Sequence, residues 1–292
     1  MNNYILISAA KNEQDYIGKT IESVIRQNIK PILWCIVSDG STDKTDEIIQ
    51  EYSKTNLFIK YIRNDKTDDR NFASKVYALN IALKYISEIK IDYDFIGNLD
   101  ADTVFDSDYY SKILEEFKKN VKLGLAGGIF FETYKGKKIK VVLASNSVRG
   151  AVQFFRRKCF EEIGGFVPLK NGGEDIITEV TARMKGWEVR TFEHLHVQNL
   201  RLSGTGRWGV IETKFREGFL AHSIGYHPLF QIIKSFYRFK ERPLIISGIL
   251  HLLGYLWAVI TNNNIKVSKE FKTYLRKEQM QRLKGTFFPT KK

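Results

Sequence analysis

Residues 32–45 read ILWCIVSDGSTDKT, and this stretch decides the fold class. Seven mostly apolar residues are followed at once by an aspartate, a glycine and a run of small polar residues. A continuous apolar run that ends in turn residues is typical of a strand buried on both faces, as the strands of a parallel sheet are. Ligands of such sheets bind at the carboxyl ends of the strands, so Asp39 is a candidate binding residue.

Apolar runs of this kind alternate with helical patterns through the first hundred residues. The predicted strands cover 4–10, 32–38, 57–62 and 93–99, and the predicted helices cover 15–27, a segment from about 42, and 72–86. Further along, the chain predicts helices near 108–119, 157–163 and 174–185 and strands at 124–134, 138–144 and 187–192. We therefore expect a mixed, mostly parallel α/β sheet flanked by helices over residues 1–206, followed by a basic helical extension over 207–292.

The composition excludes several classes of protein. Of the 292 residues, 43% are hydrophobic and 13% aromatic, which supplies a packed core and excludes disordered and fibrous chains. The 2 cysteines can form neither a disulfide framework nor a four-ligand zinc site, so a reducing, cytoplasmic compartment is expected. Residues 1–200 hold 29 basic and 28 acidic residues, whereas 201–292 hold 17 and 5, a net charge of +12. Such a basic segment favours a polyanion, either nucleic acid or an anionic membrane surface.

The basic extension also contains a long uncharged run. Pro243–Thr261 has nineteen residues without a charge, close to the roughly 20 that cross a bilayer. The preceding segment, His227–Arg242, places apolar and aromatic residues at helical spacing among lysines and arginines, as interfacial helices do. Three arrangements fit these patterns: docking on a membrane surface, which they favour, helices packed in the protein core, and a true span.

Acidic residues stand at the ends of two predicted strands. Asp39 can accept a hydrogen bond from a nucleotide base or a ribose, although the same turn also suits capping of the next helix. Asp100 and Asp102, in NLDADT, can present two carboxylates to one hard cation that also holds phosphate oxygens. Short acidic turns are common, so the metal-site interpretation depends on the position of this pair at the end of a predicted strand.

A third acidic pair, Glu174 and Asp175, follows two glycines and begins a predicted helix. The helix dipole favours an ionised carboxylate at this end. Asp175 can therefore serve as a general base that takes the proton of an attacking hydroxyl, with Glu174 as an orienting or acceptor-contact residue. Simple capping of the helix is the structural alternative.

Five motifs in this order resemble those of the family 2 glycosyltransferases with the Rossmann-like GT-A fold, across about residues 4–200. The motifs are AAKNEQDYI, SDGSTDKT, NLDADT, RRKCFEEIGGF and GGED. The resemblance implies a nucleotide-diphosphate sugar as donor, a divalent cation, and a single displacement that inverts the anomeric carbon. Asp100 and Asp102 match the metal motif, and Asp175 matches the catalytic base. The nucleotide-sugar contacts that the resemblance implies are Asn12, Glu13, Asp39, Lys75 and Asp100.

The chain departs from the family pattern at two places. The histidine that often follows the strand after the base-bearing helix is replaced by Asn199, and this residue and Arg201 are candidate diphosphate contacts. The acidic residue that usually follows the base is absent, and Glu179 lies one helical turn further on. Arg207 and Trp208 belong to a basic, glycine-containing loop that either closes over the diphosphate or acceptor or simply links the two parts of the chain.

The resemblance, together with the acidic residues that match it, implies a metal-dependent, inverting hexosyltransferase that uses Mn²⁺ or Mg²⁺ and a UDP- or GDP-sugar. A glycan or lipid-linked acceptor is expected, in surface polysaccharide or glycolipid synthesis, with the protein peripheral (monotopic) at the inner face of the cell membrane. A sugar-nucleotide nucleotidyltransferase would also use acidic metal ligands, but the first predicted strand lacks a glycine-rich phosphate loop. A non-enzymatic polyanion-binding protein would explain the basic tail, but no nucleic-acid motif is present and nucleic acid is not expected as a partner.

Overall fold

The computed structural model describes residues 3–65, 72–134, 137–141, 143–169, 172–201, 209–241, 243–261 and 267–287. The chain divides into two compact units, Met1–Leu202 and Ser203–Lys292. The loop residues Arg207 and Trp208 lie outside the described residues.

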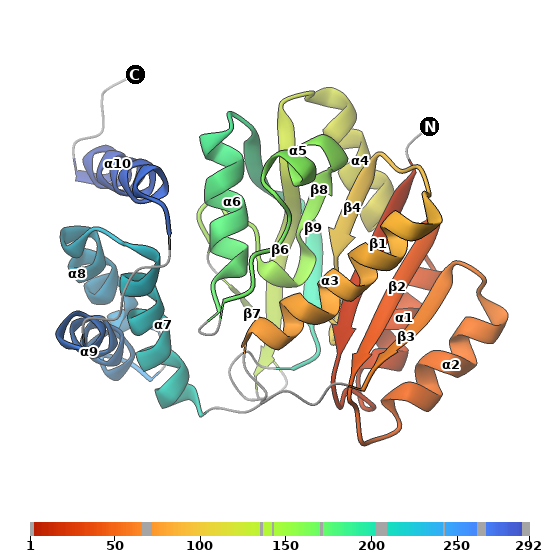
Figure 1. The fold of residues 1–292 in the computed structure, drawn as a ribbon. Helices are drawn as coiled ribbons and strands as arrows, with labels where there is room; N and C mark the ends of the chain where they lie inside the picture. Colours follow the sequence, from red (N-terminus) through yellow and green to blue (C-terminus); the bar gives the residue numbers. More distant parts are fainter. Residues whose placement is uncertain are drawn as a thin grey trace. The chain divides into compact units, whose positions relative to one another are not determined.

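The first unit is built on one mixed sheet (Figure 1). Within the described residues, nine strands take part, in the order β3-β2-β1-β4-β8-β6-β9-β5, with β7 paired to β6. The strands are β1 (Tyr4–Ala10), β2 (Leu33–Asp39), β3 (Ile59–Asn64), β4 (Phe95–Asn98), β5 (Thr103–Phe105), β6 (Leu123–Tyr134), β7 (Lys137–Lys140), β8 (Phe154–Arg156) and β9 (Glu188–Asn199). The first four strands pair in parallel, as does β6 with β9, whereas β5, β7 and β8 run antiparallel to their neighbours. The predicted mixed α/β sheet is confirmed.

Helices cover both faces of this sheet (Figure 1). Side chains alternate along each buried strand, so Leu6 and Ile36 point to one face and Ile7 and Val37 to the other. The first face is covered by α1 (Ile17–Ile25), α2 (Thr45–Thr55) and α4 (Tyr109–Lys119), and the second by α3 (Phe72–Ile89), α5 (Arg157–Glu162) and α6 (Glu174–Met184). Strands buried on both sides explain why the apolar runs in the sequence are continuous.

Several element boundaries differ from the predicted ones. Helix α2 begins at Thr45 rather than near 42, because the preceding residues bind the loop after β1. Strand β7 ends at Lys140 rather than 144. Strand β9 continues to Asn199 instead of ending at 192, because it passes a register shift against β6 and then pairs with β5.

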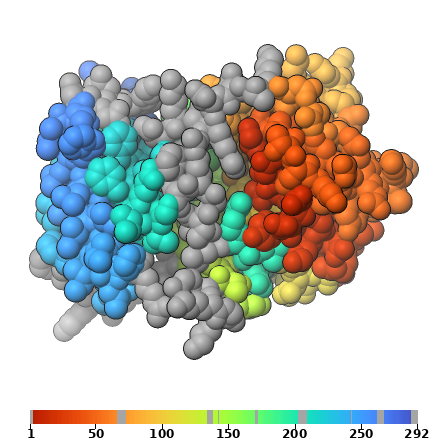
Figure 2. Space-filling view, turned by 90° about the horizontal axis from the view of Figure 1, so that it is seen from below, coloured from red at the N-terminus to blue at the C-terminus, as the bar shows by residue number. Residues whose placement is uncertain are grey.

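The parallel register brings several loops to one edge of the sheet. Ile7 of β1 stands opposite Asn98 of β4, and Asp39 of β2 stands opposite Asn64 of β3. The Leu200 N–H donates to the Asp102 carbonyl oxygen at 2.8 Å, which ties the end of β9 to the turn after β4. Figure 2 looks toward this edge from below, and the red N-terminal segment and the teal end of β9 lie side by side there.

The second unit is helical. Its helices are α7 (Val210–Ile224), α8 (Pro228–Tyr237), α9 (Ile246–Ile260) and α10 (Lys269–Phe287), with a short 3₁₀ turn, η2 (Arg238–Lys240), after α8. Glycines let α7 and α9 touch backbone to backbone: a Cβ added at Gly218 would lie 1.9 Å from the His251 carbonyl oxygen. A Cβ at Gly254 would lie equally close, 1.9 Å, to the Phe215 carbonyl oxygen, so larger residues would separate the two helices.

Helices α8 and α9 bury polar side chains and expose apolar ones. Gln231 and Ser235 of α8 are buried, and both contact the Nδ1 atom of the buried His251, at 2.8 and 3.0 Å. Burial, with the nearby charges of Arg238 and Lys234, lowers the pKa of His251 to about 2, so its imidazole is neutral. Most of the exposed apolar residues recur every three or four positions. They are Leu229, Ile232, Phe236 and Tyr237 on α8 and Ile246, Ile249, Leu253, Leu256, Trp257, Val259 and Ile260 on α9. This distribution is the reverse of that in a water-facing helix.

None of the helices in the described parts of the chain has the length and apolar composition that crossing a bilayer requires.

Candidate active site

The loops after β1 and β2 are joined by hydrogen bonds. Asn12 has a left-handed backbone conformation, with φ of 56°, and its N–H donates to Ser41 Oγ at 3.2 Å. In return, the Thr42 N–H donates to Asn12 Oδ1 at 2.8 Å. Asparagine tolerates this conformation better than most residues because its short side chain can bond locally. Asn12 therefore shapes the edge of the site while its amide oxygen is already engaged.

Asp39 ends β2 with only 8% of its surface exposed. Asn64 donates from Nδ2 to Asp39 Oδ1 at 2.8 Å, and Lys11 Nζ lies 3.9 Å from Oδ2. The carboxylate is thus held in one orientation and keeps lone pairs for further donors. A base N–H or a ribose hydroxyl is a donor of the required kind.

Arg201 joins the loop after β1 to the turn after β4. Its Nη2 atom lies 3.0 Å from Glu13 Oε1 and 3.0 Å from Asp102 Oδ2, and both carboxylates are buried. Burial raises the pKa of Glu13 to about 7, although Arg201 opposes the rise. Burial and the charge of Asp100 also raise the pKa of Asp102, and Arg201 again opposes. Arg201 therefore helps to keep two buried acids ionised.

Lys75, in the first turn of α3, pairs with the other acid of the turn after β4. Its Nζ atom lies 2.6 Å from Asp100 Oδ1. Burial lowers the pKa of Lys75, but the charges of Asp100 and Glu174 outweigh burial and bring it to about 12. A protonated lysine at the end of the sheet suits an anionic diphosphate.

The donor set at the end of β4 fits a hard divalent cation. Within the described residues, no group of three or more His, Cys, Asp or Glu side chains is arranged to hold a metal. Mg²⁺ and Mn²⁺ sites, however, often use one or two carboxylates together with waters and substrate phosphates. Asp100 and Asp102 supply two such carboxylates, and Glu13 adds a buried oxygen, Oε2, that has no hydrogen-bond partner in the described structure.

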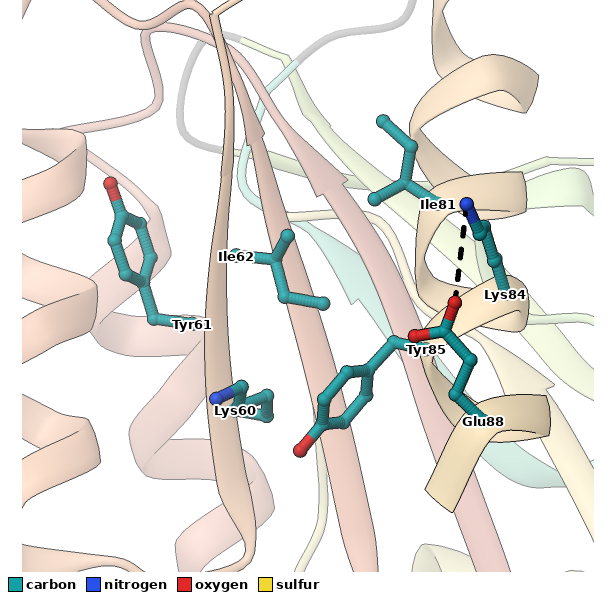
Figure 3. Close-up of a pocket in the computed structure, with 7 residues that line it drawn as sticks. All are labelled: Lys60, Tyr61, Ile62, Ile81, Lys84, Tyr85 and Glu88. Atoms are coloured by element: carbon teal, nitrogen blue, oxygen red, sulfur yellow. Dashed lines mark ion pairs between the residues drawn. The ribbon is translucent and has the colours of Figure 1, made fainter. Parts of the chain in front are cut away.

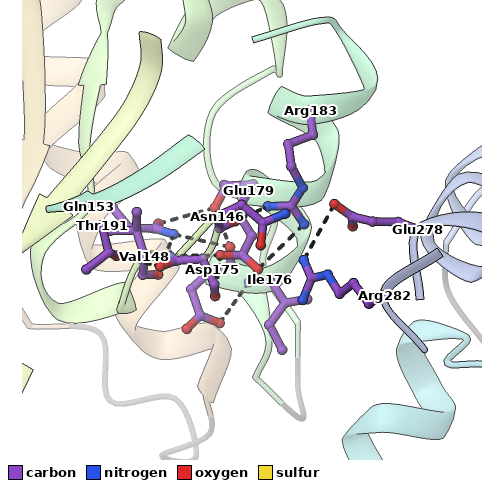
Figure 4. Close-up of polar contacts among 12 residues, drawn as sticks. Asn146, Val148, Gln153, Asp175, Ile176, Glu179, Arg183, Thr191, Glu278 and Arg282 are labelled. Carbon is purple, nitrogen blue, oxygen red and sulfur yellow. Dashed lines mark hydrogen bonds and ion pairs between the residues drawn. The ribbon is translucent and has the colours of Figure 1, made fainter. Parts of the chain in front are cut away.

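Asp175 is the second residue of α6 and follows two glycines with positive φ, Gly172 and Gly173. Its Oδ1 accepts a hydrogen bond from the Ile176 N–H at 2.9 Å, and its side chain is half-buried (Figure 4). Gly150 packs directly against it, because a Cβ there would lie 2.9 Å from Asp175 Cβ. Asp175 thus stands at a helix start, partly open to solvent, as a proton acceptor requires.

The neighbouring Glu174 has a different electrostatic environment. Burial raises the pKa of Glu174, the charge of Asp175 raises it further, and Lys75 opposes both. Lys75 also feels the charge of Asp175, so the structure brings together Lys75, Asp100 and the acidic start of α6. The predicted metal turn and the predicted base therefore share one electrostatic site.

Asn199, which replaces the family's histidine, is the last residue of β9 and is buried. It pairs with Thr103 of β5 and Glu132 of β6, and its Oδ1 has no hydrogen-bond partner among the described residues. The predicted diphosphate contact through this amide stays a prediction.

Glu179 secures α6 to the segment before β8 (Figure 4). It is buried, and its Oε2 accepts hydrogen bonds from Ser147 Oγ at 2.8 Å and from the Val148 N–H at 3.0 Å. Arg183 lies 3.8 Å from its other oxygen. Burial raises the pKa of Glu179 to about 7, and Arg183 only partly offsets it.

This pKa predicts a pH-dependent stability. The ordinary pKa is 4.5, so between pH 4.5 and 7 the folded protein binds more protons than the unfolded chain, and the free energy of unfolding falls as pH rises. Glu179→Gln should reduce this fall by up to about 3 kcal/mol, since one pKa unit corresponds to about 1.4 kcal/mol. Denaturant unfolding of both proteins at pH 4.5 and pH 7 measures the free energy of unfolding at the two ends of this range. The same change in that free energy between the two pH values in both proteins would contradict the assignment.

A separate pocket of about 440 Å³ lies between β3 and α3 (Figure 3). Its lining residues are Lys60, Tyr61, Ile62, Ile81, Lys84, Tyr85 and Glu88. None of these is a predicted site residue, so the pocket is distinct from the site at the carboxyl edge of the sheet.

The model of glycosyl transferase family 2 matches residues 5–178, more than half of the chain. The chain belongs to this family. It is 29% identical over 205 residues to a poly-β-1,6-N-acetyl-D-glucosamine synthase of Staphylococcus epidermidis, a match covering 64% of this chain and 45% of that protein. The chain thus matches about half the length of this relative.

Solved structures share the GT-A fold of this family 2 chain. A mannosyltransferase of Pyrobaculum calidifontis, in complex with GDP-Man and Mn²⁺, aligns with a TM-score of 0.57 at 15% identity and covers 99% of this chain and 88% of its own. Residues 1–349 of Staphylococcus aureus TarS, in complex with UDP-GlcNAc, align with a TM-score of 0.57 at 14% identity, over 94% and 78%. At these identities the likeness shows the fold alone.

Proposed function

We propose that this family 2 protein is an inverting glycosyltransferase that moves a sugar from a UDP- or GDP-sugar to a hydroxyl of a glycan or lipid-linked acceptor. One observation carries the proposal: the acidic turn Asp100–Asp102 and the helix start with Asp175 occupy one site, with Lys75 interacting with both. The family membership supports the donor class, and the relatedness to a polysaccharide synthase supports a glycan product.

In a single displacement, the site residues bind different parts of the donor. Asp39 and the loop with Asn12 bind the nucleoside, and Lys75 and Arg201 face the diphosphate. A divalent cation, Mn²⁺ or Mg²⁺, held by Asp100 and Asp102 would neutralise the charge of the departing nucleoside diphosphate.

Asp175 completes the displacement. It takes the proton of the acceptor hydroxyl as that oxygen bonds to the anomeric carbon, while the bond to the diphosphate oxygen breaks and its electron pair leaves with the diphosphate. Attack from the face opposite the leaving group inverts the anomeric carbon.

A donor panel tests the proposal. Purified protein is incubated with UDP- and GDP-sugars, candidate acceptors and Mn²⁺ or Mg²⁺, and released nucleoside diphosphate is measured with and without EDTA. Acceptor-dependent release from one donor class, abolished by EDTA, is expected. Formation of pyrophosphate from a sugar phosphate and a nucleoside triphosphate would instead support a nucleotidyltransferase.

We further propose that the second unit docks on an anionic membrane surface, at the inner face of the cell membrane. Helices α8 and α9 expose stripes of apolar side chains and bury polar ones, the distribution suited to an apolar surrounding. The basic excess of residues 201–292 supplies the electrostatic attraction to anionic lipid. Apolar insertion and charge together can hold a monotopic protein.

The double variant Leu253→Glu and Trp257→Glu of the full chain tests this docking. Both residues are about half exposed, and the charges should lower binding to anionic vesicles at least about tenfold. Leu57→Glu is the matched control, because Leu57 is 94% exposed on the first unit. Vesicle co-sedimentation measures the effect. Equal binding of all variants, or no binding by the natural protein, would refute the docking.

A further inference from the structure

The segment that precedes β8 lies between the two halves of the proposed active site. It includes a 3₁₀ turn, η1 (Gly150–Val152), and then Gln153. On one side its backbone bonds to the end of β4: the Asp100 N–H donates to the Ala151 carbonyl oxygen at 3.0 Å, and the Asn98 N–H donates to that of Gln153 at 2.8 Å. Asn98 Nδ2 also donates to the Gly150 carbonyl oxygen.

On its other side the same segment holds the first turn of α6 (Figure 4). Gln153 Nε2 donates to the Asp175 carbonyl oxygen at 3.2 Å and approaches that of Val148 at 3.5 Å. The Thr178 hydroxyl lies 3.2 Å from Gln153 Oε1 and 2.8 Å from the Asp175 carbonyl oxygen. The backbone of Gln153 therefore bonds to β4, and its side chain bonds to the residue that we propose as the base.

Gln153, whose hydrogen bonds connect β4 to Asp175, is buried. Gln153 is 1% exposed and Thr178 is also 1% exposed, so water does not replace these bonds when they break. A Cβ at Gly150, in the same segment, would lie 2.9 Å from Asp175 Cβ, so a glycine there lets this segment pack directly against Asp175. The separation between the acidic turn after β4 and Asp175 is thus set through Gln153.

We propose that Gln153 is a positioning residue, which fixes the Asp175 carboxylate at the distance from the Asp100–Asp102 turn that in-line displacement requires. This inference rests on the proposed function. A base displaced by about 1 Å can lose about 100-fold in rate, so a buried amide that touches no substrate can control kcat. Donor binding, which uses other residues, should be independent of it.

The test compares Gln153→Leu with Gln27→Leu in the full chain. Gln27 is the matched control because it is also a buried glutamine with bonds from both ends, to the Asp106 carbonyl oxygen at 2.7 Å and from the Tyr110 N–H at 3.1 Å. Both variants should lower Tm, but only Gln153→Leu should lower kcat, by about 10–100-fold, with the Kd of the donor retained. Equal losses of kcat in the two variants would contradict the proposal and show that Gln153 only stabilises the fold.

A second comparison keeps the test decisive if Gln153→Leu folds poorly. Thr178→Val removes the hydroxyl and should lower kcat several-fold, whereas Thr178→Ser keeps it and should retain activity. In the background of Asp175→Asn, Gln153→Leu should cause no further loss, because it acts through Asp175. A full additional loss would overturn the proposal. If the natural protein transfers no sugar from any donor, the proposed function itself fails, a result distinct from an active Gln153→Leu variant.

Discussion

Replacing Asp175 by asparagine is expected to lower kcat for sugar transfer by about 10²–10⁴-fold, the range that a positioned general base contributes. The amide keeps the size of the side chain and can still accept the hydrogen bond from the Ile176 N–H. It cannot take the proton of the acceptor hydroxyl. Donor affinity should be retained because the nucleotide and diphosphate contacts lie on other residues. Steady-state kinetics and donor titration of the same preparation measure the two quantities.

Asp108→Asn is the control for this substitution. Asp108 also stands at a helix start, as the N-cap of α4, and its carboxylate lies 2.6 Å from Lys112 Nζ, but it belongs to no part of the site. It should leave kcat unchanged. A parallel fall of donor affinity and rate in Asp175→Asn would show that Asp175 binds the donor rather than the acceptor's proton.

Asp102→Asn should abolish most metal-dependent turnover, with a loss of about 10²–10³-fold, the size of effect seen when one group that stabilises transition-state charge is removed. An amide oxygen is a poorer ligand for a hard cation than a carboxylate. The fold should survive because Arg201 keeps its partner Glu13. Mn²⁺ titration of the donor complex, followed by nucleotide release, measures both the affinity and the rate.

Asp106→Asn serves as the control for the metal site. Asp106 lies a few residues further along the chain, with an exposed side chain. Its substitution should change neither the Mn²⁺ affinity nor the rate. Full activity of Asp102→Asn, with EDTA still inhibiting the natural protein, would place the metal elsewhere.

Local patterns in the chain predicted strands β1 to β4, β6, β7 and β9 and the acidic residues that follow β2 and β4, whereas the short strands β5 and β8 were not predicted. The apolar runs around Ile36 and Leu6 predicted buried parallel strands, and a parallel sheet places Asp39 and Asp100 at one edge by its topology alone. The two glycines before Glu174 predicted the helix start that carries Asp175. In each case the signal lies within a few residues of the feature that it predicts.

Contacts between distant parts of the chain left no such signal. Arg201 and Glu13 are 188 residues apart, so their pairing, and the link that it makes to Asp102, depends on the end of β9 reaching β5. Gln153 occurs in no motif, and its role follows only from the tertiary positions of β4 and α6. Burial, joined by the charges of Asp102 and Asp100, raises the pKa of Glu13, and the sequence contains no signal for it.

The amphipathic pattern of residues 227–242 predicts a helix with one apolar and one polar stripe, but not which of the two stripes is buried. Helical spacing separates Ile232 and Phe236 from Gln231 and Ser235, yet the pattern alone does not say which stripe is buried. In the structure the polar stripe is buried against His251, and the apolar stripe is exposed. The helix that packs against α8 determines which stripe is buried, because a buried polar stripe needs hydrogen-bond partners that only another helix supplies.

The anomeric configuration of the transferred sugar tests the central claim most directly. With the donor and acceptor that the panel identifies, proton NMR of the product during the reaction reports whether the glycosidic bond has the configuration of the donor or its opposite. A single displacement with Asp175 as the base predicts the opposite configuration from the first turnover. Retention of the donor's configuration would contradict this mechanism and the role of Asp175 in it.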